Sequence, residues 1–272
     1  MKKTINILKY LFLIVASFFS IFPFIWMLIS MTNKSVEVTR GSFIPGTYLF
    51  ENVKNLFSNN LNFASSLGNS AKIALITTVL SLIISSLAGY GFEIYRSKTR
   101  DLIFNILLLS MMVPFASLMV PLFRMFSHFK IFGLNTTASV IIPSLSTAFM
   151  IFFFRQNAKA FPKDILEAGR IDGLNELQIF IKIFVPTMKS TYAAAAIITF
   201  MSSWNNYMWP LITLQTASKR TAPLIISTMS SSYTPDYGMI MAGIVITTLP
   251  TALVFFLMQK QFVEGMLGSV KG

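Results

Sequence analysis

Six long apolar stretches alternate with short polar segments along the chain, and this pattern predicts its secondary structure. Each stretch reaches the roughly 20 residues that a helix needs to cross about 30 Å of hydrocarbon. Because a backbone in lipid must satisfy its own N–H and C=O groups, such runs are expected to be helices. We therefore predict an all-α membrane protein, a single domain over 1–272 with six transmembrane helices. The predicted spans cover about residues 10–33, 70–92, 102–123, 134–155, 190–212 and 238–259.

The connections between these stretches differ in length and composition. Residues 33–60 contain glycine, proline and asparagine turn formers, so we expect an irregular outer segment that ends in a short amphipathic piece. Residues 93–101 are too few for anything but a tight turn. Pro114 and Pro121 lie inside the third stretch and predict kinks, which neighbouring helices tolerate by satisfying the freed carbonyl groups.

The longest polar segment on the side of the termini covers residues 156–189, and its first half reads as a helix. Pro162 suits a first helical turn, where its missing N–H is not needed, and Asp164 places negative charge near the positive end of the helix dipole. We expect this helix to run to about Asp172 and to stop at Gly173, which can adopt the left-handed cap conformation.

The second half of this segment reads as another helix. Asn175 can cap it, with Gln178 three residues later in a variant of the capping box. This helix is mainly leucine, isoleucine and phenylalanine, and Pro186 marks its end. Residues 162–186 are therefore predicted to form a helical hairpin.

The two helices of the hairpin differ in polarity. The first is polar at Glu167, Arg170 and Asp172 and small at Ala168 and Gly169, so another surface can approach it closely. The second is apolar and is expected to lie against the membrane helices. The pattern predicts a hairpin that is anchored by one helix and presents the other to a cytoplasmic partner, which suits it to transmitting movement.

Composition supports the membrane assignment and its orientation. The 272 residues are 54% hydrophobic and 12% charged, with a mean hydropathy of +0.66 and a net charge of +12. If both termini are cytoplasmic, fourteen basic residues, including Lys271, lie on the inner side and seven on the outer side, as the positive-inside rule requires. The basic excess is thus interpreted as a topology signal, with no nucleic acid as a partner. The absence of cysteine excludes disulfides, thiolate metal sites and thiol nucleophiles.

The hairpin sequence EAGRIDGLNELQIFIKIFVP carries a recognisable pattern. It resembles the EAA motif of inner-membrane permeases of binding-protein-dependent ABC importers. Gly169 and Val185 stand where that motif has alanine and leucine, and both keep a small or aliphatic character. The matching positions are Glu167, Ala168, Gly173, Ile183 and Pro186.

The resemblance covers nearly the whole chain. The segments NSAKIALITTVLSLIISSLAGYGF, MVPFASLMVPLF, GLNTTASVIIPS, SSWNNYMWPL and QFVEGMLGSVKG are similar to the carbohydrate-uptake branch of the family, in particular to the smaller maltodextrin permease subunit. The resemblance implies a type I ABC importer permease fold, in which the hairpin is a coupling helix that docks on an ATP-hydrolysing subunit. It implies coupling roles for Glu167, Ala168, Gly169, Asp172, Gly173, Ile183 and Pro186.

The family also implies partners and a location. These are a second homologous permease subunit, two cytoplasmic ATPase subunits, an extracellular solute-binding protein, a sugar substrate and the lipid of the bacterial cytoplasmic membrane. The chain lacks a Walker A sequence, so ATP and Mg²⁺ are expected on the ATPase subunits and no cofactor or metal on this non-enzymatic chain.

Polar residues in the fifth stretch allow two interpretations. Uncharged polar groups at membrane depth often hydrogen-bond helices together. They can also line a water-filled path, because sugars bind through hydroxyl hydrogen bonds and aromatic stacking. The candidate path or gate residues are Ser203, Trp204, Asn205, Asn206 and Tyr207.

Two other functions remain open at the level of sequence. One is an ABC permease for a different solute, such as a polyamine, phosphate or peptide. The other is a secondary transporter that works alone, which the lack of acidic residues within the six stretches disfavours because such coupling usually relies on buried ionisable groups.

Overall fold

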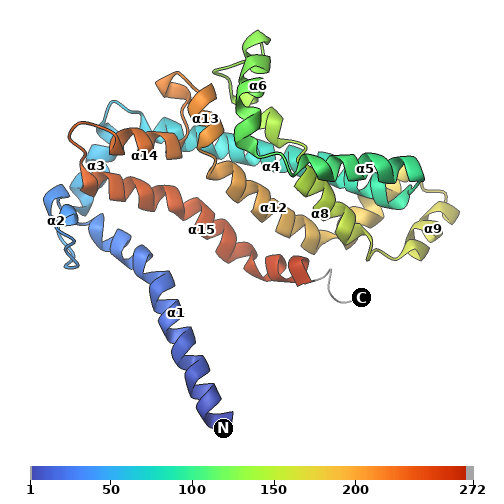
Figure 1. The fold of residues 1–272 in the computed structure, drawn as a ribbon, viewed down its shortest axis with the longest axis horizontal. Helices are drawn as coiled ribbons and strands as arrows, with labels where there is room; N and C mark the ends of the chain where they lie inside the picture. The colour runs from blue at the N-terminus through green and yellow to red at the C-terminus, as the bar shows by residue number, and fades with distance from the viewer. Residues whose placement is uncertain (1, 268–272) are drawn as a thin grey trace. The chain divides into compact units, whose positions relative to one another are not determined.

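The computed structural model describes residues 2–267, and every regular element in that range is a helix, which confirms the all-α prediction (Figure 1). Lys271 and the last five residues of QFVEGMLGSVKG lie outside the described residues. The elements are α1 Lys2–Ser30, α2 Ser35–Thr39, α3 Leu49–Ser58, α4 Phe63–Ile94, α5 Lys98–Ser110, α6 Phe115–His128, α7 Thr137–Ile141, η1 Ile142–Ser144, α8 Ala148–Ala158, α9 Lys163–Ile171, α10 Glu176–Ile179, η2 Phe180–Phe184, α11 Val185–Thr187, α12 Lys189–Trp204, α13 Met208–Thr213, η3 Ala217–Lys219, α14 Ala222–Ser230 and α15 Tyr237–Leu267.

Three helical segments are long and apolar enough to cross a membrane singly: Asn6–Ser30, Phe63–Ile94 and Tyr237–Lys260. They coincide with the first, second and sixth predicted spans. Three further spans form only if bent pairs of helices are counted together, which brings the described part of the chain to the predicted six. α5 meets α6 at 101°, α7 with η1 meets α8 at 41°, and the helix over Glu176–Thr187 meets α12 at 81°.

The kink predicted at Pro114 is confirmed by the bend between α5 and α6. The continuous helices expected over 134–155 and 190–212 are wrong in detail, because the first is broken before α8 and the second is broken between α12 and α13. Pro114 precedes α6 in an extended conformation, and proline both lacks an N–H and disfavours helix in the residue before it. Thr147 starts α8 by accepting a hydrogen bond from the Met150 amide at 3.3 Å.

The chain packs as two compact units, of which the first contains residues up to 65 together with 222–250. The Asn52 side chain holds its loops by donating to the carbonyls of Met31 and Asn33, both at 2.9 Å. The outer segment is more ordered than predicted, because α2 forms within it, while α3 confirms the expected amphipathic piece.

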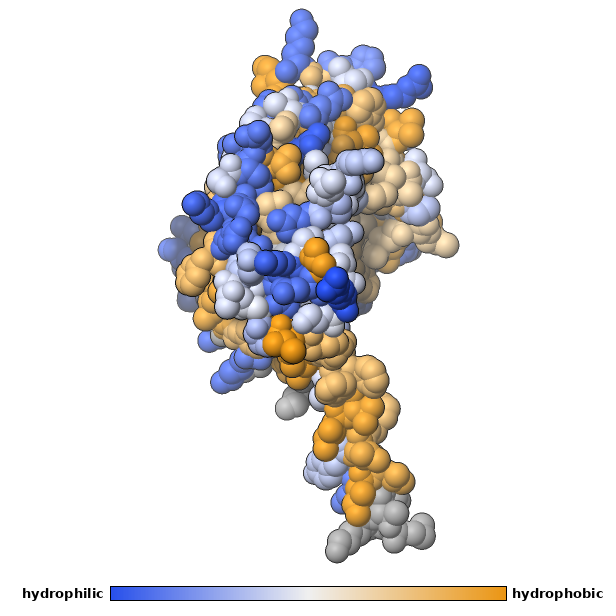
Figure 2. Space-filling view, turned by 90° about the vertical axis from the view of Figure 1, so that its left-hand side faces the viewer, coloured by the Kyte–Doolittle hydropathy of each residue, from blue (hydrophilic) through white to orange (hydrophobic). Residues whose placement is uncertain are grey.

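Within this unit, α1 is apolar along most of its length and exposes those side chains. None of its most hydrophobic window is buried by the rest of the chain. Figure 2 shows the resulting hydrophobic surface on the extended arm that α1 forms. Such a surface is typical of a helix surrounded by lipid or by another membrane subunit.

The second unit contains residues 66–221 and those from 251 onward. Here α8 packs against α5 and α12 (Figure 1). α8 also lies close to α4, because a Cβ added to Gly89 would stand 2.6 Å from the Cβ of Phe154. Phe154 and Ala195 are fully buried in the core between α8 and α12.

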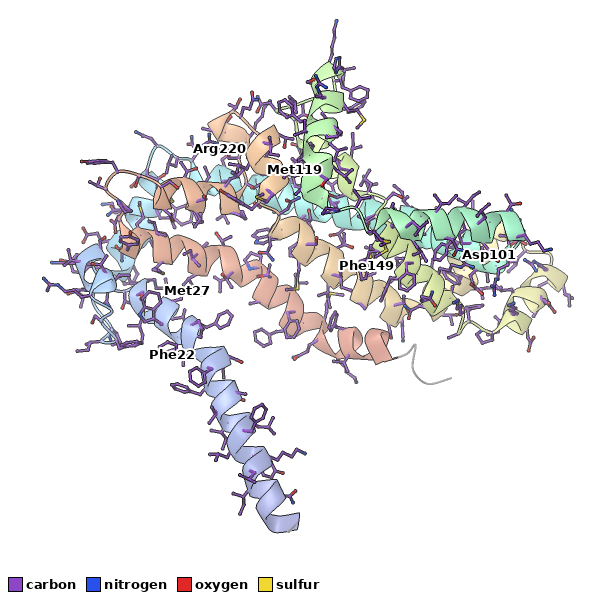
Figure 3. The ribbon with its side chains drawn as sticks, viewed as in Figure 1. Phe22, Met27, Asp101, Met119, Phe149 and Arg220 are labelled. Atoms are coloured by element: carbon purple, nitrogen blue, oxygen red, sulfur yellow. The ribbon has the colours of Figure 1, made fainter. Side chains whose placement is uncertain are left out.

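A buried ion cluster joins the ends of α4, α5 and α8. Arg155 on α8 pairs with Glu93 through Nε and Oε2 at 3.4 Å and with Asp101, which Figure 3 labels at the start of α5. Its guanidinium also lies 4.0 Å from the centroid of the Phe104 ring. Arg96 adds a second positive charge near the same carboxylates at 3.8 and 3.9 Å. Two arginines thus balance two acids where the α4–α5 turn meets α8.

Candidate functional site

The polar segment forms the predicted hairpin, and its turn follows from two local rules. α9 ends where Gly173 adopts a positive φ of 79°, a conformation that glycine takes without a Cβ penalty. Asn175 then caps α10, since Gln178 N donates to Asn175 Oδ1 at 2.9 Å and Asn175 N donates to Gln178 Oε1 at 3.0 Å. Pro162 occupies the position before α9 rather than its first turn.

The second helix of the hairpin is anchored, as predicted. Ile179 and Phe184 are fully buried, and Phe184 packs against Tyr90 at the end of α4 with ring centroids 4.9 Å apart. The ring centroid of Phe161, just after α8, lies 5.4 Å from that of Phe184. The helix continues through a π-helical turn, η2, past Pro186 to Thr187. The hairpin is therefore packed onto the ends of α4 and α8.

Gly169 lies on the inner side of the hairpin and not on its presented surface. It is buried, and an added Cβ would stand 2.8 Å from Ile183 Cδ1 and 3.4 Å from Ile179 Cγ1. The glycine therefore allows the two helices of the hairpin to approach each other closely. Since the nearest atom is the end of a flexible side chain, alanine at this position requires only a small shift of Ile183.

A polar contact also joins the two helices. Arg170 Nε donates to Glu176 Oε1 at 2.8 Å, and the Tyr90 hydroxyl donates to Glu176 Oε2 at 3.4 Å. Hydrogen bonds from Arg170 and Tyr95 lower the pKa of the Glu176 carboxyl below its ordinary value of 4.5. Burial raises the pKa of the Tyr95 phenol. Glu176 thus links α9, α10 and the end of α4.

The described residues of this chain leave several side chains of the hairpin exposed. The apolar side chain of Ile171 is 86% exposed beside the acid of Asp172, and Leu177 is 61% exposed. Most of the residues predicted to couple to the ATPase are exposed, while Gly169 is buried and Ile183 half-buried. The exposed ones are Glu167, Ala168, Asp172, Gly173 and Pro186.

The candidate path residues in the fifth stretch do not share one environment. Trp204 is buried and stacks on Phe200 with ring centroids 5.7 Å apart, so it contributes to packing. Asn205 ends α12, and its side chain donates to the Met201 carbonyl at 2.9 Å. Both residues belong to the end of a helix.

Ser203 and Asn206 instead line a cavity of about 240 Å³ in the second unit. Ser202, the first serine of the same polar run, lines the same cavity. Tyr207 is half-buried directly before α13. The structure therefore places two of the five predicted path residues on a hollow surface.

Other functional candidates were missed from sequence. Thr77 and Ser81 on α4 also line the cavity, and Ser85 follows at the same spacing of four. That spacing within an apolar stretch was an available signal, because residues four apart share a helix face. The pair of Glu93 and Arg155 left no such signal, because its members lie 62 residues apart.

The residues that the structure describes give no support for a metal centre. Within 2–267, no group of three or more histidine, aspartate or glutamate side chains is placed to hold a metal ion. The chemistry available at the hairpin is therefore recognition by shape, apolar contact and charge.

Comparison with known families gives a match over most of the chain. A family described as "Binding-protein-dependent transport system inner membrane component" matches residues 81–267. This range includes the hairpin and the cavity-lining residues from Ser81 onward, but not Thr77.

Individual proteins agree with the family match. The chain is 50% identical over 266 residues to the lactose transport system permease protein of Rhizobium radiobacter, covering 98% of this chain and 96% of that protein. It is 35% identical over 279 residues to the arabinooligosaccharides transport system permease protein of Halalkalibacterium halodurans, covering 100% and 99%.

The fold agrees with that of a solved transporter. A chain from the crystal structure of a bacterial ABC transporter involved in the import of the acidic polysaccharide alginate superposes with a TM-score of 0.85. The match covers 96% of this chain and 97% of that chain at 22% identity, so the likeness concerns the fold.

Proposed function

Because the chain belongs to the family of inner-membrane components of binding-protein-dependent transport systems, it is a transport component and not an enzyme, and we propose that it moves a sugar across the membrane. More specifically, it would be a permease subunit of an ABC importer for a sugar or oligosaccharide. The identities to permeases for lactose and arabinooligosaccharides support a sugar over a polyamine, phosphate or peptide.

The observation that carries the coupling mechanism is the hairpin. Its second helix is packed onto the ends of α4 and α8, whereas Glu167 on its first helix and Asp172 directly after that helix are exposed. A rigid element held in this way transmits displacement from an outside partner to the helices that it contacts. We assign that partner as a cytoplasmic ATPase subunit, since the chain contains no Walker A sequence.

The proposed complex contains this chain, a second homologous permease, two ATPase subunits and an extracellular solute-binding protein. ATP and Mg²⁺ would bind the ATPase subunits, and no cofactor is assigned to this chain. The basic residues support an orientation with both termini in the cytoplasm. Closure of the ATPases on ATP would move the hairpins and turn the permeases outward, and hydrolysis would reset them.

Reversing one charge on the presented face tests this proposal. Glu167→Lys is expected to lower uptake of radiolabelled lactose or arabinotriose at least about tenfold, a coupling loss of about 1.4 kcal/mol. The chain should still reach the membrane, because the exposed Glu167 supports no core contact. The measurements are uptake by cells that carry the complete system and the amount of this chain in their membranes.

Lys98→Glu is a matched control, because Lys98 is exposed at the start of α5 and lies outside the hairpin. Its uptake should equal that of the wild type. Normal uptake and normal sugar-stimulated ATPase activity in Glu167→Lys would refute the assignment of the hairpin as the coupling element.

A further inference from the structure

The cavity between α4, α8 and α12 has a polar wall inside an otherwise apolar unit. Its volume is about 240 Å³, and hydroxyl groups from α4, α12 and the segment before α8 line it together with the amide of Asn206. The lining residues of α8 itself are the apolar Phe149 and Met150. A second hollow of about 260 Å³ shares four lining residues with the first and is therefore next to it. The polar side chains used below are Thr77, Ser81, Thr147, Thr199, Ser202 and Asn206.

Three of these hydroxyls have no hydrogen-bond partner within the described chain. They belong to Thr77, Ser81 and Thr199, and each oxygen is buried. Serine and threonine in helices usually bond to the carbonyl one turn earlier, and Thr78 on the same helix does so, donating to Ala74 O at 2.7 Å. A buried hydroxyl without a partner is costly, so these three are expected to find one in another molecule.

The alternative that these groups hold helices together does not account for them. A hydroxyl that joins two helices needs an acceptor on the facing helix, and none lies within hydrogen-bond distance of these three. The cavity is also not expected to be an empty packing defect, because empty cavities in proteins have apolar walls and this one has a polar wall. The volume exceeds the roughly 30 Å³ of one water molecule several times over.

The lining also indicates which ligand fits. No ionisable side chain is among the described residues that border either hollow, so an anion would lack a countercharge. A sugar ring instead offers hydroxyls that donate and accept, and its C–H face can pack on aromatic rings. Phe149, labelled in Figure 3, borders the first hollow, and Phe115 and Trp209 border the second.

We propose that this cavity binds the hydroxyl groups of an uncharged sugar during its passage, with Thr77, Ser81, Thr199 and Ser202 as binding residues on this chain. The proposal rests on the sugar-import function proposed above. The volume is below the roughly 300–1,000 Å³ of small-molecule pockets, so the site holds about one ring of a longer sugar.

Removing one hydroxyl group tests whether it binds sugar or only packs inside the protein. Ser81→Ala is expected to lower lactose or arabinotriose uptake about threefold to tenfold, as the loss of one hydrogen bond does. The variant should be at least as stable to heat as the wild type, since a buried unpartnered hydroxyl is removed. The matched control is Ser85→Ala, one turn further along α4, which removes an equally buried and unpartnered hydroxyl outside the lining. Equal uptake in both variants would overturn the proposal.

A second experiment uses the absence of cysteine in the chain. In the complete complex in nanodiscs, a water-soluble methanethiosulfonate should modify Thr147→Cys and Ser202→Cys during ATP turnover, and lactose or arabinotriose should slow that reaction. The control Ser146→Cys is exposed and adjacent but outside the lining, so sugar should not change its rate. Glycerol 3-phosphate, an anion, should not protect; if it does, the uncharged-ligand assignment fails.

The two experiments distinguish this inference from the function on which it rests. If wild-type cells import neither sugar, the sugar-import function fails and the cavity assignment fails with it. If they import a sugar that protects neither cavity thiol, only the cavity assignment is overturned.

Discussion

At the scale of single residues, the hairpin contains two glycines, Gly169 and Gly173, in different surroundings. Gly173 is exposed, and an added Cβ would meet nothing within 4 Å, yet its φ of 79° is unfavourable for a residue with a Cβ. Gly169 has the opposite reason to be glycine, because space is short there and its conformation is ordinary. Two glycines four residues apart thus serve different physical purposes.

Two substitutions at Gly173 distinguish the effect of backbone strain on hairpin stability from the effect of side-chain size. Gly173→Val is expected to destabilise the hairpin by about 1–2 kcal/mol, since a β-branched residue is strained at positive φ. Gly173→Asn should cost less, because asparagine visits this region more readily. Hydrogen exchange of the α9 and α10 amides measures both, and equal protection in the two variants would contradict the argument.

The ionisation of Glu176 gives the hairpin a predicted pH dependence. The pKa of its carboxyl is lowered in the folded chain, so the contribution of the Arg170 contact is complete above the ordinary value of 4.5. It is lost as the pH falls through the lowered pKa. The protection of the α10 amides, which is the ratio of the intrinsic to the observed exchange rate, should therefore decrease below pH 4.5.

The Glu176→Gln variant is the control for that measurement, because it cannot titrate. Its exchange, corrected for the intrinsic pH effect, should change little over the same range. If wild type and variant respond alike, the carboxylate does not hold the hairpin.

At the scale of elements, α4 connects the candidate sites of the second unit. Its middle part carries Thr77 and Ser81 on the cavity, and its end carries Tyr90 against the hairpin and Glu93 in the ion cluster. A helix is stiff over this distance, so we expect a shift of the hairpin to reach the cavity wall through α4.

We expect the two arginines of the ion cluster to contribute unequally to the stability of the chain. Arg155→Met should destabilise the chain by about 3–5 kcal/mol, because it leaves the buried carboxylate of Glu93 without its main partner. Arg96→Met removes a contact to the same acids from a side chain that is 53% exposed, and should cost no more than about 1 kcal/mol. Denaturation of the purified chain in detergent compares them, and similar losses would refute the distinction.

At the scale of the whole molecule, the two units divide the candidate functions unequally. The hairpin and the polar cavity both belong to the second unit, and all their residues except Thr77 lie within the range that matches the transport family. The first unit contains α1, whose apolar side chains are exposed along the membrane-length segment. A chain with such a surface and no nucleotide-binding sequence is expected to work only as part of an assembly.

Reconstitution tests that expectation. The purified chain alone in lipid vesicles should give no lactose or arabinotriose flux above that of empty vesicles. The complete complex with its solute-binding protein should accumulate one of these sugars when ATP is supplied on the ATPase side. Flux through the chain alone would instead indicate a secondary transporter or channel.

Sequence by itself determined the helical class, the hairpin and its family, because these depend on interactions between near neighbours. Residues 162–186 contain their own signals, since the left-handed glycine and the Asn175–Gln178 cap act over three or four positions. The all-helical character follows in the same way from the length of the apolar stretches.

Only the tertiary structure decided which polar residues meet. Glu93 and Arg155 pair across 62 residues, and the cavity joins α4 to the end of α12. It also decided that the fourth and fifth stretches are broken, that Trp204 packs against Phe200 and that Gly169 faces inward. The physical reason is that burial and side-chain partners are set by helices distant in sequence, whereas caps, turns and helix lengths are set within a few residues.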